Sequence, residues 1–187
     1  MKWHRIPVSV SWSLLAPAAA LPAPAFAVEY LTPHQAEAAL FPEAESFEAR
    51  ELTLSELDRR SLQARLGLPV RNRWVVHLAW RGGQLLGTVV LDDVIGKFDR
   101  ITFATGVGSD GSLRPVEILA YRESHGGEVR MKKWRDQFVG KTEASALRVG
   151  DDIANISGAT LSCQHVTEGV RRIVAIVGQF RRSGALR

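Results

Sequence analysis

The chain has 187 residues, of which 45% are hydrophobic and 24% are charged, and its formal net charge is +4 at pH 7. This length and balance are typical of one globular domain and exclude a disordered or fibrous protein. Two of the four net charges lie within the first 27 residues, which leaves +2 on the rest. Basic residues there are interspersed with acidic ones and form no long run, so we expect no nucleic-acid binding.

Cysteine and histidine usage restricts the chemistry further. Cys163 is the only cysteine, which allows no intramolecular disulfide, no thiolate zinc cluster and no C-x-x-C-H haem attachment. The five histidines are scattered, without the H-E-x-x-H or similar spacing that places two imidazoles on one metal. We therefore predict no metal site, and any redox chemistry needs an organic cofactor.

Residues 1–27 have the pattern of a secretory signal peptide. Two basic residues are followed by an apolar stretch over residues 8–21 and by the small-x-small sequence Ala25-Phe26-Ala27. A membrane anchor is the alternative, but prolines interrupt a stretch that is shorter than the roughly 20 residues needed to cross a bilayer. We expect cleavage and a mature periplasmic protein that begins near Val28.

Residues 28–72 are predicted to be an N-terminal helical segment. Thr32 is an N-cap residue followed by Pro33, which predicts a short helix that ends at Pro42. Ser55 can cap a second helix that stops at Gly67. The remaining residues, 73–187, are assigned to a second unit that carries the function.

Strands and a long helix are predicted in this second unit. Residues 74–80, 85–91, 101–107 and 113–122 are rich in apolar and β-branched residues and are separated by glycine-containing breaks. They predict two successive hairpins of an antiparallel sheet. A short helix follows over residues 131–138, and apolar residues recur at helical spacing from Cys163 to Val177. The predicted fold class is α+β, with the sheet packed against a C-terminal amphipathic helix and shorter helices.

The six residues before this helix, Ser157-Gly158-Ala159-Thr160-Leu161-Ser162, are small or hydroxyl-bearing except for the leucine. Unpaired backbone N–H groups and the positive end of the dipole attract anions to a helix start. Glycine and alanine there let a bulky ligand approach the backbone, and the Ser162 hydroxyl lies where a phosphate is stabilised. The alternative is a plain N-cap worth about 1 kcal/mol, and the residues alone leave both interpretations open.

A resemblance favours the first interpretation. Residues 157–162 resemble the S/T-G-A-T-x-T/S flavinylation motif of the FMN-binding domain family. This family includes the C subunit of the sodium-translocating NADH:quinone reductase, the G subunit of the Rnf complex and the periplasmic domain of NosR. Residues 121–128 resemble the family loop H-x-E-T-P-G-x-G, and residues 134–141 are similar to W-x-x-Q-F-x-G-K. The chain departs from the family pattern at Ala154, where Asp is common, and at Tyr121, where the loop has His.

The resemblance implies a cofactor, a site and partners. The cofactor is FMN, joined by a phosphoester to Ser162. The site it implies consists of Ser157, Gly158, Ala159, Thr160, Leu161 and Ser162 around the phosphate, and of Glu123, Ser124, His125, Gly126 and Gly127 beside the isoalloxazine ring. A periplasmic FAD:protein FMN transferase, which uses FAD and Mg²⁺, is the expected maturation partner. A membrane-bound electron donor or acceptor is the expected redox partner.

The expected function is electron transfer, without a catalytic residue. Glu123 is either a solvated loop carboxylate or a general acid or base, and Cys163 is either structural or a thiol whose pKa is lowered at a helix start. Two other functions remain open. One is a non-covalent flavin-binding accessory module for respiratory assembly or metal uptake, and the other is a flavin-dependent reductase of small molecules.

Overall fold

The computed structural model describes residues 28–123 and 125–186. The predicted signal peptide and one predicted site residue, Ser124, lie outside the described residues. The strands are β1 (Val28–Glu29), β2 (Ser46–Thr53), β3 (Arg73–Arg81), β4 (Gln84–Ile95), β5 (Arg100–Gly108) and β6 (Leu113–Tyr121). The helices are α1 (Pro33–Leu40), α2 (Glu56–Leu66), α3 (Lys132–Arg135) and α4 (Thr160–Arg182), with 3-10 turns η1 (Gly127–Arg130) and η2 (Asp136–Phe138).

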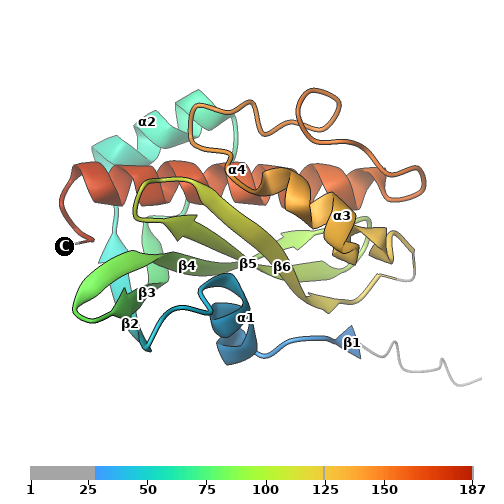
Figure 1. The fold of residues 1–187 in the computed structure, drawn as a ribbon. Coiled ribbons are helices and arrows are strands. Elements are labelled where there is room, and N and C mark those ends of the chain that lie inside the picture. The colour runs from blue at the N-terminus through green and yellow to red at the C-terminus, as the bar shows by residue number, and fades with distance from the viewer. Residues whose placement is uncertain (1–27, 124, 187) are drawn as a thin grey trace, which may run out of the picture.

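The strands form one antiparallel sheet in the order β1-β6-β5-β4-β3-β2 (Figure 1). The two predicted hairpins are confirmed as β3–β4 and β5–β6. The sequence analysis missed β2, which pairs with β3 along its whole length, from Ser46 opposite Trp80 to Thr53 opposite Arg73. Residues 28–72 are therefore not only helical. The charged side chains of β2 hide the apolar pattern by which a strand is usually predicted. Such charges are common on an edge strand, because they protect it against pairing with another chain.

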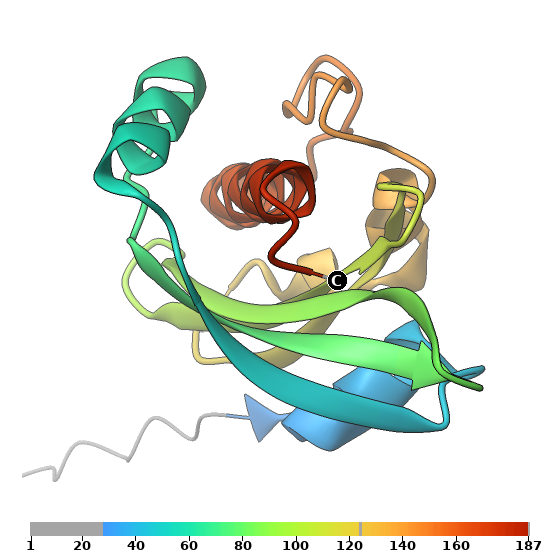
Figure 2. The ribbon, with the colours of Figure 1, turned by 90° about the vertical axis from the view of Figure 1, so that its left-hand side faces the viewer.

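Helices cover both faces of the sheet. Figure 2 shows α4 lying across one face with α2 beside it, and α1 on the opposite face. The main core lies between α4 and the sheet, and a smaller cluster lies under α1. Side chains of β3 alternate between the two, since Val76 and Leu78 belong to the main core and Ala79 to the smaller one. This alternation and the packed helices confirm the predicted α+β class.

The predicted helix caps are present at α1 and α2. The Thr32 hydroxyl accepts a bond from the Gln35 N–H at 3.3 Å, and the Gln35 side chain accepts one from the Thr32 N–H at 2.8 Å. The Ser55 hydroxyl accepts a bond from the Asp58 N–H at 3.1 Å, and Gly67 ends α2 with φ of 66°. Local sequence therefore fixed the starts of both helices and the end of α2, whereas α1 ends at Leu40, two residues before the predicted stop at Pro42.

The C-terminal half differs in detail from the expectation. The predicted helix over residues 131–138 is divided into α3 and η2, preceded by η1. Helix α4 begins at Thr160, three residues before the predicted start, and packs closely on the sheet at Gly169. A Cβ atom at Gly169 would lie 2.5 Å from Cζ of Phe103, so only glycine allows this approach of helix and strand.

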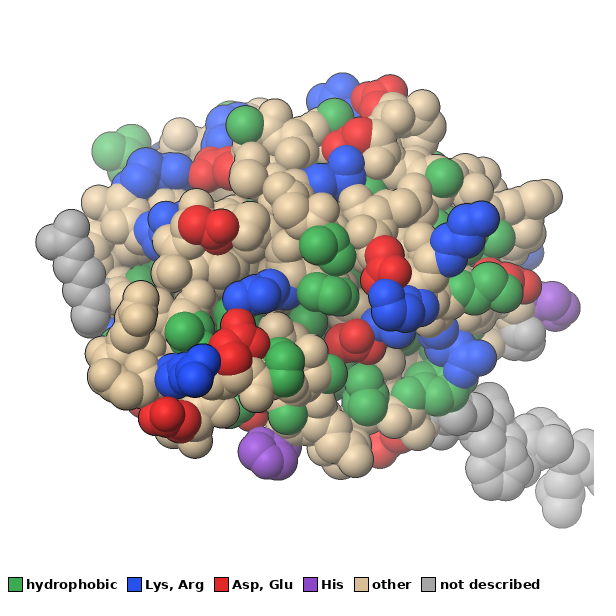
Figure 3. Space-filling view, viewed as in Figure 1, with side chains coloured by type: hydrophobic (Ala, Val, Ile, Leu, Met, Phe, Trp, Pro, Cys, Tyr) green, Lys and Arg blue, Asp and Glu red, His purple; other side chains and the backbone are tan. Residues whose placement is uncertain are grey.

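The surface carries both signs of charge. Figure 3 shows acidic and basic side chains interspersed over the face in view. Within the ranges that the structure describes, no helix combines the length and the hydropathy needed to cross a bilayer.

Candidate functional site

A cavity of about 430 Å³ lies at the N-terminal end of α4. Three segments meet around it, namely the turn between β4 and β5, the segment after β6, and the start of α4. The lining residues are Lys97, Phe98, Glu123, His125, Gly158, Ala159, Thr160, Leu161 and Ser162. Its volume is within the range of about 300–1,000 Å³ that is usual for cofactor and small-molecule sites.

Most of the predicted site residues meet at this cavity. Those that line it are Gly158, Ala159, Thr160, Leu161, Ser162, Glu123 and His125. Ser157 is exposed in the turn that precedes Gly158, and Gly126 packs behind the cavity against Ser162. Gly127 instead lines a different cavity on the other side of the loop.

Ser162 is held by a tyrosine that the sequence analysis did not assign to the site. Its hydroxyl lies 3.0 Å from that of Tyr121, which in turn donates to the His125 carbonyl at 2.5 Å. Burial raises the pKa of Tyr121, although the bond with Ser162 acts against this rise. The phenol is therefore protonated at neutral pH, and because it has one hydrogen, the Ser162 hydroxyl is the donor in the bond between them.

The N-cap interpretation of Ser162 is wrong. The N-cap position of α4 is Ala159, which makes no side-chain cap bond, and Ser162 lies in the first turn with 4% of its surface exposed. A helix start has N–H groups without partners inside the helix, and the dipole is positive there. The uncapped end of the 23-residue helix α4 therefore faces the cavity with groups that favour an anion.

Gly126 closes the loop over this helix start. Its φ is 86°, and a Cβ atom there would lie 2.6 Å from the Tyr121 hydroxyl and 3.1 Å from the Ser162 hydroxyl. Glycine is required by both the left-handed backbone and this close approach. The loop consequently packs directly on the hydrogen bond between Tyr121 and Ser162.

Glu123 has a role that the sequence analysis did not foresee. Its carboxylate accepts bonds from the backbone N–H groups of Phe98 at 2.6 Å and Asp99 at 3.0 Å. Burial acts to raise the pKa of Glu123, but these backbone donors outweigh it and the pKa is lowered. Glu123 is thus neither a freely solvated carboxylate nor a poised acid, but a clamp that joins the segment after β6 to the β4–β5 turn.

A histidine holds the same turn from the side of α4. Nδ1 of His165 lies 2.5 Å from the Ile95 carbonyl oxygen and 3.2 Å from that of Gly96. A carbonyl only accepts, so Nδ1 carries the hydrogen. Cys163 on the same helix is fully buried, and burial raises its pKa, so the alternative of a thiol with a lowered pKa is excluded.

Two residues of the segment similar to W-x-x-Q hold the chain before the Ser157 turn. Nε1 of Trp134 donates to the Ala154 carbonyl at 2.8 Å, and the Ala154 N–H donates to Oε1 of Gln137 at 2.8 Å. Both bonds go to backbone, so they do not depend on which side chain stands at position 154. They position the segment that leads into α4.

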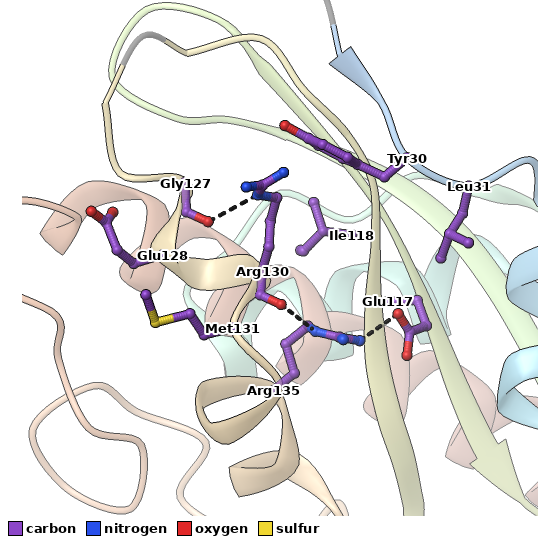
Figure 4. A pocket seen from close by; sticks show the side chains of 9 residues that line it. All are labelled: Tyr30, Leu31, Glu117, Ile118, Gly127, Glu128, Arg130, Met131 and Arg135. Atoms are coloured by element: carbon purple, nitrogen blue, oxygen red, sulfur yellow. Dashed lines mark hydrogen bonds and ion pairs between the residues drawn. The ribbon is translucent and has the colours of Figure 1, made fainter.

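The second cavity, of about 720 Å³, lies on the other side of the loop and is shown in Figure 4. Arg135 crosses it to form an ion pair with Glu117, and also donates to the Arg130 carbonyl at 2.9 Å. The Arg130 guanidinium lies 4.1 Å from the centre of the Tyr30 ring. These contacts hold η1 against β6 and thereby support the loop that covers Ser162.

Sequence reasoning missed two residues that line the first cavity, and Tyr121, which contacts Ser162 beside it. Tyr121 belongs to the segment that resembles the family loop, but appeared there only as a departure from histidine. Lys97 and Phe98 lie in a hairpin turn, where no periodicity marks a ligand site. Among the described residues, no group of three or more His, Cys, Asp or Glu side chains is placed to hold a metal ion.

Comparison with known families agrees with this geometry. Residues 96–175 match the model of the FMN-binding domain. No curated protein sequence matches the chain. The matched range begins at the β4–β5 turn and includes the loop after β6 and the start of α4, which are the three segments around the first cavity. The uncapped helix end and the adjacent hydroxyl suit the phosphate of FMN, and the cavity suits a ring system. Residues 96–175 are therefore an FMN-binding domain, and the cofactor that this domain indicates is FMN.

Proposed function

We propose that this protein is a periplasmic electron carrier whose FMN is joined by a phosphoester to Ser162. The observation that carries the proposal is the position of Ser162, a residue that lines the cavity in the first turn of the uncapped helix α4. The predicted signal peptide supports export, and the family supports electron transfer.

Different residues of the site are proposed to hold the phosphate and the ring of FMN. The first turn of α4 offers backbone N–H groups and the positive end of its dipole to the phosphate. The exposed backbone at Gly158, where φ is 85°, leaves open space beside it. Glu123 and His125 form the wall next to the ring. FMN supplies the capacity to accept and release electrons, and the protein supplies position and electrostatics.

Attachment is proposed to occur by transfer from FAD on a flavin transferase. The Ser162 oxygen forms a bond to the phosphorus of the FMN half, the diphosphate P–O bond breaks, AMP leaves with that electron pair, and the serine proton is released. No atom changes oxidation state. Because Tyr121 accepts the serine hydrogen bond, the lone pairs of the serine oxygen remain available for this attack.

The site suits a carrier better than a reductase with its own acid or base. Glu123 is occupied by two backbone donors and Tyr121 by the His125 carbonyl. These contacts fix the wall of the cavity and leave neither group poised for proton transfer. The proposed partner is a membrane-bound electron donor or acceptor.

Intact-mass measurement of the protein, expressed with a periplasmic flavin transferase, tests the proposal. We expect a chain that begins near Val28 and carries the mass of FMN less one water, with flavin fluorescence retained after denaturation. Ser162→Ala should lose the adduct and Ser162→Thr should keep it. Ser183→Ala is the matched control, since it removes a serine hydroxyl at the other end of α4, outside the lining of the cavity, and should keep the adduct.

Each other outcome has a defined meaning. Colour that is lost on denaturation indicates non-covalent binding, and colourless protein indicates a module without flavin. An unchanged adduct on Ser162→Ala shows that another hydroxyl is used. Turnover of a small molecule by the loaded protein would instead favour a reductase.

A further inference from the structure

The β4–β5 turn places an unusually exposed aromatic side chain beside the FMN site. Phe98 is 75% exposed, yet its side chain lines the same cavity as Ser162. The Lys97 ammonium lies 4.9 Å from the centre of the Phe98 ring and lines the cavity as well. Leu161, 40% exposed, lies on the opposite segment of the cavity wall.

This turn is held in place from two directions. The Glu123 carboxylate binds the N–H groups of Phe98 and Asp99, and the His165 ring binds the carbonyls before them. At Gly96 a Cβ atom would lie 2.5 Å from Oε1 of Glu123, so the turn packs tightly on its clamp. A turn fixed on both sides that presents an exposed aromatic ring is preorganised to contact a ligand.

We propose that Phe98 and Lys97 form the second wall of the flavin site. The Phe98 ring stacks on the isoalloxazine ring, and the Lys97 charge stabilises the electron-rich reduced flavin. This proposal rests on the FMN site described above, and adds two contact residues to it. Glu123 and His165 are then positioning residues, because they act through the turn and not on the ring.

The physical consequences of the two side chains differ. An exposed phenyl ring loses its contact with water when a flat aromatic system covers it, and offset stacking adds a favourable contact. A positive charge near the ring favours the reduced form, because electrons added to the flavin increase its negative charge. Phe98 should therefore govern ring immobilisation, and Lys97 the midpoint potential.

The test uses protein loaded with FMN, with the loading measured by intact mass. Lys97→Gln should lower the equilibrium constant for reduction about tenfold, which is about 30 mV for a two-electron couple. Lys97→Arg should retain the wild-type potential. Lys133→Gln is the matched control, since this exposed lysine lies on α3 outside the lining of the cavity. Equal potentials for Lys97→Gln and Lys133→Gln would overturn the role of the charge.

Phe98 is tested through flavin fluorescence and absorbance. Phe98→Ala should increase flavin emission severalfold by removing the stacking partner, whereas Phe98→Trp should quench it at least as strongly as wild type. Unchanged emission in Phe98→Ala would overturn the stacking. Circular dichroism should be unchanged, because the side chain is mostly exposed.

Failure of covalent attachment is distinguishable from failure of this inference. If wild-type protein carries no adduct, FMN is titrated into it and binding is followed by fluorescence. Phe98→Ala should then weaken binding about tenfold relative to Lys133→Gln. Equal affinities of these two variants for FMN would refute the proposal that Phe98 contacts the flavin, whether or not a phosphoester forms.

Discussion

Tyr121→Phe tests whether the Tyr121 hydroxyl organises the attachment site. The substitution keeps the buried ring, which is 4% exposed, and removes only the oxygen that joins the His125 carbonyl to the Ser162 hydroxyl. The main core around the ring is preserved. Any effect therefore reports the two hydrogen bonds and not a cavity.

The expected magnitude follows from these two bonds. Each buried hydrogen bond contributes about 1 kcal/mol net, so the free energy of unfolding should fall by about 2 kcal/mol. For a domain of this size, a change of 1 kcal/mol moves the melting temperature by roughly 2–4 °C, which gives about 4–8 °C here. The Ser162 hydroxyl also loses the partner that fixes its direction, so FMN attachment should slow severalfold without moving to another residue.

The assay combines thermal unfolding of the unloaded protein with a time course of intact mass during flavin transfer. Tyr30→Phe is the control, because Tyr30 is the only other tyrosine in the chain and its ring lies beside Arg130 in the other cavity. We expect the control to melt and to accept FMN like wild type. If Tyr121→Phe behaves as this control does in both measurements, the hydroxyl does not organise the site and the reasoning is refuted.

Two further predictions concern the supports of the fold. Glu143 accepts bonds from Arg182 at 2.8 Å and Arg65 at 2.6 Å, and although its burial acts in the opposite direction, these bonds lower its pKa below the ordinary value of 4.5. Its contribution to stability is therefore present above that value and lost as the pH falls through the lowered pKa. Urea unfolding from about pH 6 to pH 3 should show a steeper loss of stability for wild type than for Glu143→Gln, and parallel curves would contradict this assignment. Trp134→Phe removes the bond to the Ala154 carbonyl and should cost about 1–3 kcal/mol in urea unfolding and reduce the yield of FMN adduct; a wild-type yield would show that this bond does not position the segment before α4.

Much of the fold could be predicted from the sequence because the signals are local. The caps at Thr32 and Ser55 act over three residues, and the four strands β3–β6 are marked by apolar runs between glycine-rich turns. The amphipathic pattern of α4 likewise identifies its buried face. Strand β2 was missed because it carries many charged side chains. A strand accommodates such charges when it lies at the edge of a sheet, and the edge position of β2 is set by its pairing with β3.

Part of the candidate site could likewise be predicted from local sequence, and part could not. The sequence determined that a hydroxyl-bearing, glycine-containing segment precedes a long amphipathic helix, and the resemblance connected that segment with FMN. The tertiary structure alone decided that Ser162 lies inside the first turn and bonds to Tyr121, 41 residues away, and that Glu123 clamps a turn 24 and 25 residues away. Such contacts join segments far apart in the chain, and their partners are chosen by the register of β5 on β6 and by the packing of α4 on the sheet, which no local pattern of residues encodes.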